Sequence, residues 1–157
     1  MKTLVQVNIY RWRDGQLEFL LLKRADSKDT YWQPVTGHME PSGNVGDTLK
    51  REVIEETGIR KFKDLTEQLY TYEWYSDDQR EKGNDLVFGA EVRPDTEVKL
   101  DPKKHDAFEW LPYEEALRRL KWDGNKESLR RLYERLQGQQ TAGPVAGSDD
   151  YSEDPGF

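Results

Sequence analysis

The sequence predicts an α+β or α/β sandwich in which helices pack on a mixed β-sheet. Two observations support this fold class: strand-like and helix-like stretches alternate along the chain, and a hairpin turn signal separates the first two strand-like stretches. At 157 residues the default is one domain with a core of ordinary size. We expect this domain over residues 1–137, because no periodic apolar set follows it.

The first two strands are expected over residues 4–12 and 17–25, which are rich in β-branched, aromatic or leucine residues. Asp14 and Gly15 lie between them, and Asp-Gly is a strong signal for a two-residue hairpin turn. The two stretches should therefore pair as antiparallel strands.

A helix is expected over residues 44–57, since the stretch has helical composition and is followed by Gly58. Glycine adopts positive φ at little cost and so ends a helix readily. Two further strands are expected over residues 67–75 and 85–92, joined by a polar loop.

The C-terminal part of the domain should contain a short strand over residues 108–111, a helix that opens at Pro112, and a last helix over residues 126–136. The last helix carries leucines at i, i+3 and i+7, namely Leu129, Leu132 and Leu136. Leucines at this spacing form one buried helix face.

Composition excludes several classes of protein. The chain has no cysteine, which excludes disulfides and thiolate metal sites. No apolar run is long enough for a membrane span, and we expect a soluble, cytoplasmic protein. A net charge of −7 argues against a broad nucleic-acid surface, although a local metal site would still admit a small anionic substrate.

The negative charge is concentrated at the C-terminal end. Residues 138–157 contain four acidic residues and no lysine or arginine. This stretch is rich in glycine, serine, proline and acids, so it cannot bury enough surface to offset its ordering entropy. We predict an acidic, disordered tail over residues 138–157; a short acidic recognition motif is the alternative.

The candidate chemistry lies in the helix over residues 44–57. At 100° per residue, Glu52, Glu55 and Glu56 fall within an arc of about 100°, while Leu49 and Val53 supply a buried stripe. Three such carboxylates repel one another, and hard cations such as Mg²⁺ or Mn²⁺ remove that penalty because they prefer oxygen ligands. Taken alone, an ExxEE pattern is more often a solvated helix face.

The surrounding residues make the pattern more specific than ExxEE alone. The fixed positions are Gly37, Arg51, Glu52, Glu55, Glu56 and Gly58. At these residues the sequence resembles the Nudix hydrolases, whose box reads G, five residues, E, seven residues, then R-E-U-x-E-E-x-G-U, with U apolar. One position departs, because Gly43 stands where the family has its first box glutamate. Glu40, three residues earlier, could partly replace it.

The resemblance implies a Nudix-type α/β/α sandwich and a Mg²⁺- or Mn²⁺-dependent enzyme. Such enzymes cleave a diphosphate bond by water attack on phosphorus. The metal ligands that the resemblance implies are Gly37, by its backbone carbonyl, Glu52, Glu55 and Glu56. The catalytic residues that it implies are Glu55, Glu56, Arg51, which usually braces a box glutamate, and Glu40.

Two basic residues, Lys23 and Arg24, end the second expected strand and are candidates for binding the substrate phosphates. An ordinary surface pair is the alternative. If hydrolysis is slow, we expect the substitution Gly43→Glu to raise it, since it restores the family's box glutamate.

The general base stays open at this point. Some Nudix enzymes take it from a later loop with a glutamate before a histidine, whereas here Lys104 precedes His105. Asp101, Asp106 and Glu81 are alternatives. We expect His105 to be a structural or surface histidine rather than a ligand, because hard cations prefer oxygen.

Substrate clues lie just before the box. Residues 31–40, YWQPVTGHME, are similar to the corresponding stretch of dihydroneopterin triphosphate diphosphatases, and the C-terminal region also resembles theirs. A flat base or pterin needs an aromatic platform, which Trp32, Tyr31 and Trp74 could provide. We expect Trp110 to belong to the core instead.

The leading hypothesis is a metal-dependent pyrophosphohydrolase that acts on a nucleoside or pterin triphosphate. Two alternatives stay open: a Nudix-fold module that binds a nucleotide without efficient catalysis, suggested by Gly43 and Lys104, and a diadenosine polyphosphate or nucleotide-sugar hydrolase. The expected partner is a small molecule, without a membrane or broad nucleic-acid surface. A homodimer is one open oligomeric state.

Overall fold

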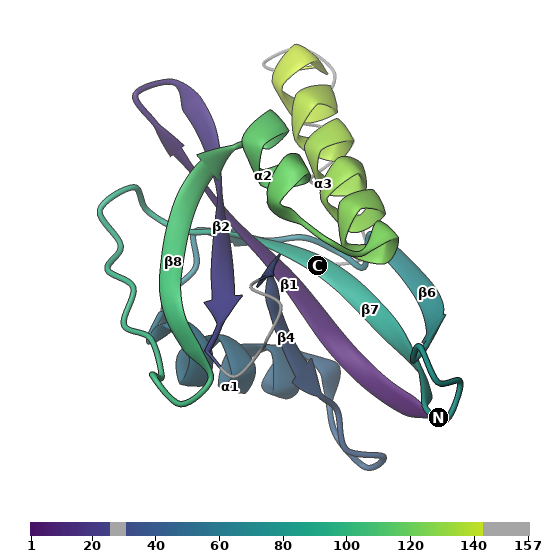
Figure 1. The fold of residues 1–157 in the computed structure, drawn as a ribbon. Coiled ribbons are helices and arrows are strands. Elements are labelled where there is room, and N and C mark those ends of the chain that lie inside the picture. The colour runs from purple at the N-terminus through teal and green to yellow at the C-terminus, as the bar shows by residue number, and fades with distance from the viewer. Residues whose placement is uncertain (26–30, 143–157) are drawn as a thin grey trace.

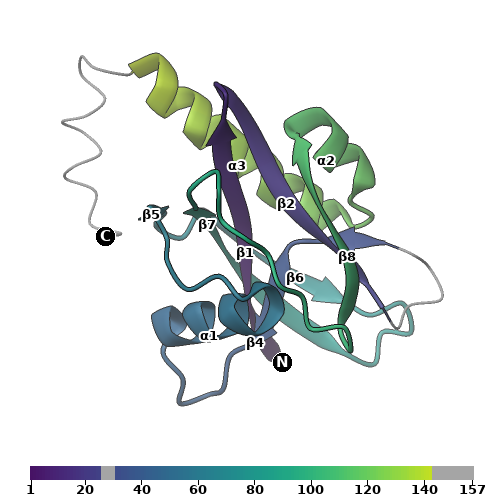
Figure 2. The same cartoon turned by 90° about the vertical axis from the view of Figure 1, so that its left-hand side faces the viewer.

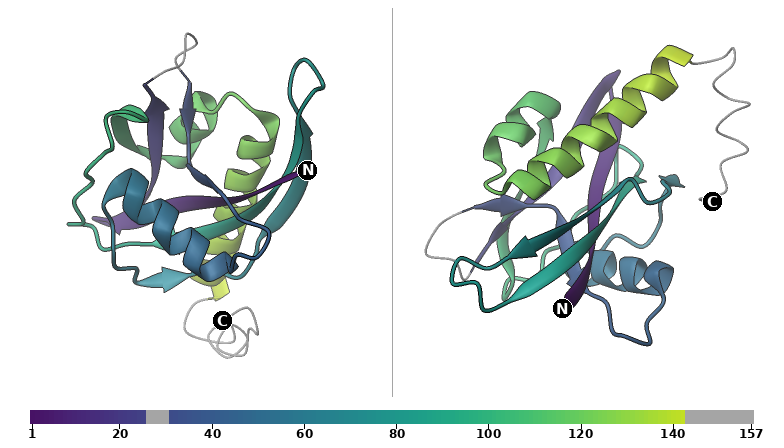
Figure 3. Two further views of the ribbon diagram at one scale, coloured as in Figure 1. Left: turned by 90° about the horizontal axis from the view of Figure 1, so that it is seen from below. Right: turned by 90° about the vertical axis from the view of Figure 1, so that its right-hand side faces the viewer.

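The structure is a computed structural model, and it describes residues 1–25 and 31–142. Within these residues, an eight-stranded mixed sheet lies between helices (Figures 1 and 2). Helix α1 (Val45–Thr57) covers one face, and helices α2 (Tyr113–Arg119) and α3 (Asp123–Ala142) cover the other. Figure 3 shows α1 and α3 on opposite sides of the sheet from two further directions. The predicted α/β sandwich with a mixed sheet is confirmed.

The long strands form the middle of the sheet. Strand β1 (Lys2–Arg13) pairs in parallel with β7 (Lys82–Glu91) and antiparallel with β2 (Gln16–Arg24). Strand β8 (His105–Pro112) pairs with β2, and β6 (Tyr70–Tyr75) pairs with β7, both antiparallel. All five were predicted, although β8 is longer than expected because it pairs with β2 along nearly all its length.

The β1–β2 turn confirms the predicted hairpin. Asp14 has φ 52° and Gly15 has φ 80°, as a two-residue turn with two left-handed residues requires. The turn sets the register, in which Trp12 pairs with Leu17.

Three short strands were not predicted: β3 (Trp32–Gln33), β4 (Val35–His38) and β5 (Asp64–Leu65). They pair with β2, β1 and β7, respectively. Two to four residues carry too little periodicity to be read from sequence, so only pairing with a long strand defines them.

Helix α1 has the predicted limits at both ends. The Asn44 side chain caps its first turn by accepting a hydrogen bond from the Asp47 backbone N–H at 3.1 Å. Gly58 follows its last turn with φ 73° and donates its backbone N–H to the Ile54 carbonyl at 2.8 Å.

Two hydrophobic cores hold the helices to the sheet, because alternate β1 side chains face opposite layers. The core under α1 includes Val5, Val7, Ile9, Leu49 and Val53. The core under α2 and α3 includes Tyr10, Leu129, Leu132 and Leu136. The predicted buried stripe of α1 and the predicted leucine face of the last helix are both confirmed.

Helix α3 begins earlier and ends later than predicted, running through Ala142. The expected domain end at residue 137 therefore falls inside this helix. The rest of the predicted tail, residues 143–157, lies outside the described residues. No helix in the described part of the chain is long and apolar enough to cross a lipid bilayer.

Candidate functional site

Helix α1 and strand β4 meet at Gly37 and Glu52. A Cβ atom at position 37 would lie 2.1 Å from Glu52 Cδ, so only glycine leaves room for this carboxylate beside the strand. Glu52 is 8% exposed. The two sequence-predicted residues are thus in direct contact, although they come from different elements.

Glu56 lies one turn further along α1 and is more deeply buried, at 3% exposure. Its Oε1 atom has no hydrogen-bond partner among the described residues. Burial, together with the nearby Glu52 charge, raises the pKa of Glu56 to about 8, although Lys104 opposes both. Glu52 and Glu56 thus form a close, buried carboxylate pair.

Glu55 and Arg51 lie on the more exposed side of α1. The Glu55 side chain is 49% exposed, and its Oε1 is 4.0 Å from Arg51 Nε. Arg51 also donates to the His38 carbonyl at 3.2 Å and to Glu52 Oε1 at 3.3 Å. Arg51 therefore ties α1 to the end of β4, which is the geometry that a bracing role requires.

A divalent cation fits this group of atoms. The site offers oxygen donors from two carboxylates, and one of these oxygens, Glu56 Oε1, is buried without a partner. Gly37 leaves room for the Glu52 carboxylate, which a Cβ would displace. Such a set of oxygen donors suits Mg²⁺ or Mn²⁺. In the described residues, no three His, Cys, Asp or Glu side chains converge as a ready-made cluster, and Glu55 lies beside Arg51. Mg²⁺ is commonly bound by one or two carboxylates and several waters, so the pair at Glu52 and Glu56 is sufficient.

Glu40 and Gly43 form the turn before α1. The Gly43 N–H donates to the Glu40 carbonyl at 2.7 Å, and the Glu40 side chain is exposed. A Cβ at position 43 would lie 2.9 Å from that backbone oxygen, so a side chain there must shift the turn. The structure thus gives no support to the expected gain from Gly43→Glu, and it does not bring the Glu40 side chain into the buried pair.

The two basic residues predicted to bind phosphates, Lys23 and Arg24, have different neighbours. Lys23 Nζ lies 3.5 Å from Asp106 Oδ1. Arg24 pairs across the sheet with His105, whose Nε2 is 4.0 Å from Glu56 Oε1. Of the two basic residues, Arg24 is therefore the one that pairs with a residue next to the carboxylates, namely His105.

His105 is 2% exposed, and its Nε2 lies 3.0 Å from Gln33 Nε2. The surface alternative for this histidine is wrong. His105 is the first residue of β8 and lies next to Glu56, so it forms part of the wall of the carboxylate site.

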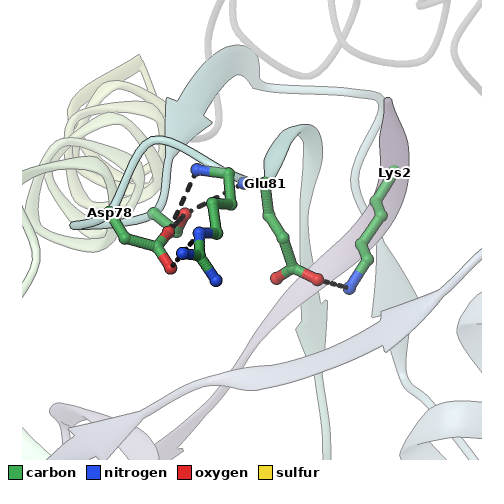
Figure 4. Close-up of polar contacts among 5 residues, drawn as sticks. Lys2, Asp78 and Glu81 are labelled. Atoms are coloured by element: carbon green, nitrogen blue, oxygen red, sulfur yellow. Dashed lines mark hydrogen bonds and ion pairs between the residues drawn. The ribbon is translucent and has the colours of Figure 1, made fainter.

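The three candidate bases already have partners. Asp101 Oδ1 accepts the Lys103 backbone N–H at 3.0 Å, and Asp106 faces Lys23. Glu81 Oε1 accepts a hydrogen bond from Lys2 at 2.9 Å, in the loop between β6 and β7 (Figure 4). Their present contacts do not direct any of them to the carboxylate pair.

The same loop is closed by its own hydrogen bonds. Ser76 Oγ donates to Asp78 Oδ1 at 2.6 Å and accepts the Glu81 backbone N–H at 3.0 Å. These contacts hold Ser76, which lines a cavity next to the carboxylate site.

That cavity has a volume of about 430 Å³ and lies on the sheet face that α3 covers. Its aromatic lining consists of Tyr31, Tyr72, Trp74, Tyr75 and Trp122. Gln33 and Thr36 also line it, and the Thr36 backbone N–H donates to Glu56 while Gln33 contacts His105. The cavity and the carboxylate pair are therefore neighbours separated by β4.

Only some of the aromatic residues predicted to form a platform line the cavity. Tyr31 and Trp74 line it, whereas Trp32 packs against the core under α3 with the Arg119 guanidinium 5.2 Å from its ring. Trp110 packs against the core under α1, as expected. Trp122 was not predicted to line a site, because only the path of the chain before α3 brings it opposite Tyr31, at 6.1 Å between ring centroids.

Comparison with known proteins identifies the family of this arrangement. A family model described as the NUDIX domain matches residues 2–132. The chain is 33% identical over 119 residues to bis(5'-nucleosyl)-tetraphosphatase [asymmetrical] of Rattus norvegicus, covering 72% of this chain and 76% of that protein. It is 30% identical over 133 residues to an octanoyltransferase of Myxococcus xanthus, covering 81% of this chain but only 35% of that protein.

Solved structures share the fold. An Ap4A hydrolase of C. elegans in a binary complex superposes with a TM-score of 0.74 at 24% identity, covering 88% of this chain and 99% of the other. The E. coli dihydroneopterin triphosphate pyrophosphohydrolase superposes with a TM-score of 0.70 at 23% identity, covering 82% and 92%. At these identities the likeness shows the fold, which agrees with the Nudix-type sandwich expected from the box.

Proposed function

The chain belongs to the Nudix family of hydrolases, and we propose that it uses Mg²⁺ or Mn²⁺ to cleave a phosphoanhydride bond in a small nucleotide-like substrate. The observation that carries the proposal is the buried pair of Glu52 and Glu56 against Gly37, with one carboxylate oxygen left unpartnered. Two buried carboxylates this close together are costly, and the hydrogen bond from Arg51 reaches only Glu52, so the pair favours a bound cation.

Each residue of the site has a proposed role. A divalent cation, once bound, supplies charge neutralisation at the phosphate oxygens and lowers the pKa of water. Glu52, Glu56 and the Gly37 carbonyl hold it. Arg51 keeps Glu52 in place, and the solvent-accessible Glu55 accepts the proton of the attacking water.

The substrate that we propose first is a nucleoside or pterin triphosphate, cleaved to pyrophosphate and a monophosphate. The aromatic cavity beside the carboxylates supports this choice, because a ring attached to the phosphate chain has room there. A dinucleoside polyphosphate is the second candidate, which the 33% identity to the rat tetraphosphatase favours. We also propose a cytoplasmic location, as expected from the sequence.

A substrate screen tests the proposal. Nucleoside triphosphates, dihydroneopterin triphosphate and diadenosine tetraphosphate are incubated with the chain and Mg²⁺ or Mn²⁺, and the released phosphate, pyrophosphate and nucleotide products are measured. We expect turnover with at least one substrate and loss of that turnover in Glu56→Gln. The matched control is Glu97→Gln, at an exposed glutamate.

Two outcomes contradict the proposal. Full activity in a folded Glu56→Gln variant overturns the role of the buried pair. Tight nucleotide binding without release of any product favours the alternative of a nucleotide-binding module.

A further inference from the structure

A row of buried polar side chains lies where the strands should present apolar residues to the layer under α3. Gln6 is 0% exposed, Asn8 2% and Asp85 5%. Interior positions of this kind are usually apolar, because a buried polar group costs free energy unless it is fully hydrogen-bonded. The proposed hydrolytic site on the other side of β4 does not require this row.

Asp85, on β7, is the common acceptor of the row. Its Oδ1 accepts Trp74 Nε1–H at 2.9 Å. Its Oδ2 accepts Gln6 Nε2–H at 3.0 Å and the Tyr72 hydroxyl at 3.1 Å. Gln6 is in turn held by Asn8, whose Nδ2 donates to Gln6 Oε1 at 3.2 Å. One carboxylate thus accepts three donors from two other strands.

Two of these donors belong to the walls of the aromatic cavity, because Trp74 and Tyr72 both line it. The Trp74 ring is fixed a second time by Gly83, where a Cβ would lie 2.5 Å from Trp74 Cζ2. The hydrogen bond to Asp85 and the close approach to Gly83 restrict the indole from two sides.

Filling this space with an apolar side chain would avoid the cost of a buried carboxylate. Burial raises the pKa of Asp85, and the hydrogen bonds from Gln6, Trp74 and Tyr72 oppose that shift. The carboxylate does what an apolar side chain cannot: it accepts hydrogen bonds from the Trp74 indole and the Tyr72 phenol. Because hydrogen bonds are directional, these two bonds orient both rings.

We propose that Asp85 is a positioning residue for substrate specificity, holding Trp74 and Tyr72 so that the cavity accepts a flat heteroaromatic group of the substrate. This inference rests on the proposed function only in placing the phosphate chain at Glu52 and Glu56. Asp85 also lines the cavity, but donors from Trp74, Gln6 and Tyr72 occupy both of its carboxylate oxygens. It therefore acts through the two rings, and it should govern the affinity for ring-bearing substrates and not the chemical step.

Asp85→Asn tests the proposal, because an amide keeps the shape but turns one acceptor into a donor facing Gln6 or Tyr72. We expect KM for the ring-bearing triphosphate to rise about tenfold while kcat stays within about twofold. Hydrolysis of inorganic tripolyphosphate, which carries no ring, should be unchanged. A merely structural role would lower the turnover of both compounds together.

Trp74→Phe is the second variant, in case Asp85→Asn does not fold. It keeps a ring in the cavity and removes the N–H that donates to Asp85. We expect a smaller rise in KM and non-additive effects when the two substitutions are combined. The matched control is Asp64→Asn, the same change at an exposed position on β5, which should leave both constants unchanged.

Binding separates this proposal from the hydrolytic one. Affinities for the ring-bearing triphosphates and for tripolyphosphate are measured by calorimetry, whether or not turnover occurs. A loss confined to the ring-bearing compounds in Asp85→Asn supports the inference even if the chain hydrolyses nothing. Equal losses for both classes, or a wild-type chain that binds no ring-bearing triphosphate more tightly than tripolyphosphate, overturn it.

Discussion

Glu56 is the residue whose surroundings say most about the site. It is charged in water at neutral pH, yet the fold buries it next to Glu52 and raises its pKa to about 8. A group whose pKa is higher in the folded than in the unfolded state stabilises the fold while it is protonated. Its contribution is therefore complete at low pH and is lost as the pH rises toward 8.

The first prediction concerns this pH dependence. In EDTA, the free energy of unfolding of the wild type should fall as the pH rises from about 5 to about 8, because the buried carboxyl must ionise. Urea unfolding at pH 5, 7 and 9 measures the slope. Glu56→Gln has no charge to lose, so it should show a smaller decrease over this range.

Metal addition supplies the complementary measurement. Mg²⁺ should restore stability to the wild type at pH 8, by about 2.7 kcal/mol at a concentration one hundred times its Kd, and much less to Glu56→Gln. Equal stabilisation of both proteins would contradict the assignment of Glu56 as a ligand.

The second prediction concerns Gly37. Its substitution by alanine places a Cβ 2.1 Å from Glu52 Cδ, so the carboxylate must move out of the cradle. We expect a loss of at least about tenfold in kcat, because a misplacement of about 1 Å is enough for a large loss in rate. Steady-state kinetics measures the loss, and circular dichroism checks the fold. Wild-type activity in this variant would mean that Glu52 is not needed where it lies.

At the scale of elements, helix α1 presents apolar side chains to the sheet and carboxylates to the proposed metal site. Leu49 and Val53 anchor it on the sheet, while the carboxylates occupy the neighbouring strip toward β4. Its ends are fixed locally, by Asn44 at the start and by Gly58 at the finish. The helix is thus a rigid support whose stability can be changed without touching the carboxylates.

The third prediction tests that separation. Asn44→Ala removes the side chain that caps the first turn and should cost about 1 kcal/mol in the free energy of unfolding, measured in urea. The kcat of the folded variant should stay close to that of the wild type. Asn44→Ser, which keeps a capping oxygen, is the matched control and should recover most of the loss. A large fall in kcat with unchanged stability would show that the turn before α1 takes part in the reaction.

At the scale of the whole molecule, apolar cores on opposite faces of the sheet hold helices α1, α2 and α3. The carboxylate pair belongs to the side of α1 and the aromatic cavity to the side of α3, and β4 lies between them. The proposed function requires a substrate that spans β4, with its phosphates at the carboxylates and its ring in the cavity.

The fourth prediction concerns the C-terminal end. Among the residues whose burial the structure describes, Leu136 is the last member of either core, and we expect that deleting residues 143–157 changes the free energy of unfolding by less than about 0.5 kcal/mol. The net charge would change from −7 to about −3. Urea unfolding and the substrate screen on the shortened chain test this, and a loss of more than about 1 kcal/mol would contradict it.

The sequence by itself determined the features that depend on neighbouring residues. The Asp14-Gly15 turn, the limits of α1 and the spacing of its glutamates are local, because turn geometry, capping and helical period act over a few residues. The spacing of Gly37 from Arg51 identified the family for the same reason, since it is a property of one continuous stretch.

Only the tertiary structure decided how deeply each glutamate is buried, which aromatic side chains share a cavity, and where Asp85 points. Glu52 and Glu56 became a pair, while Glu55 turned to Arg51. The Asp85 contacts join β1, β6 and β7, which are up to 79 residues apart in the chain. Contacts of that span leave no local pattern in the sequence, because they depend on how the strands pair and on what the helices cover.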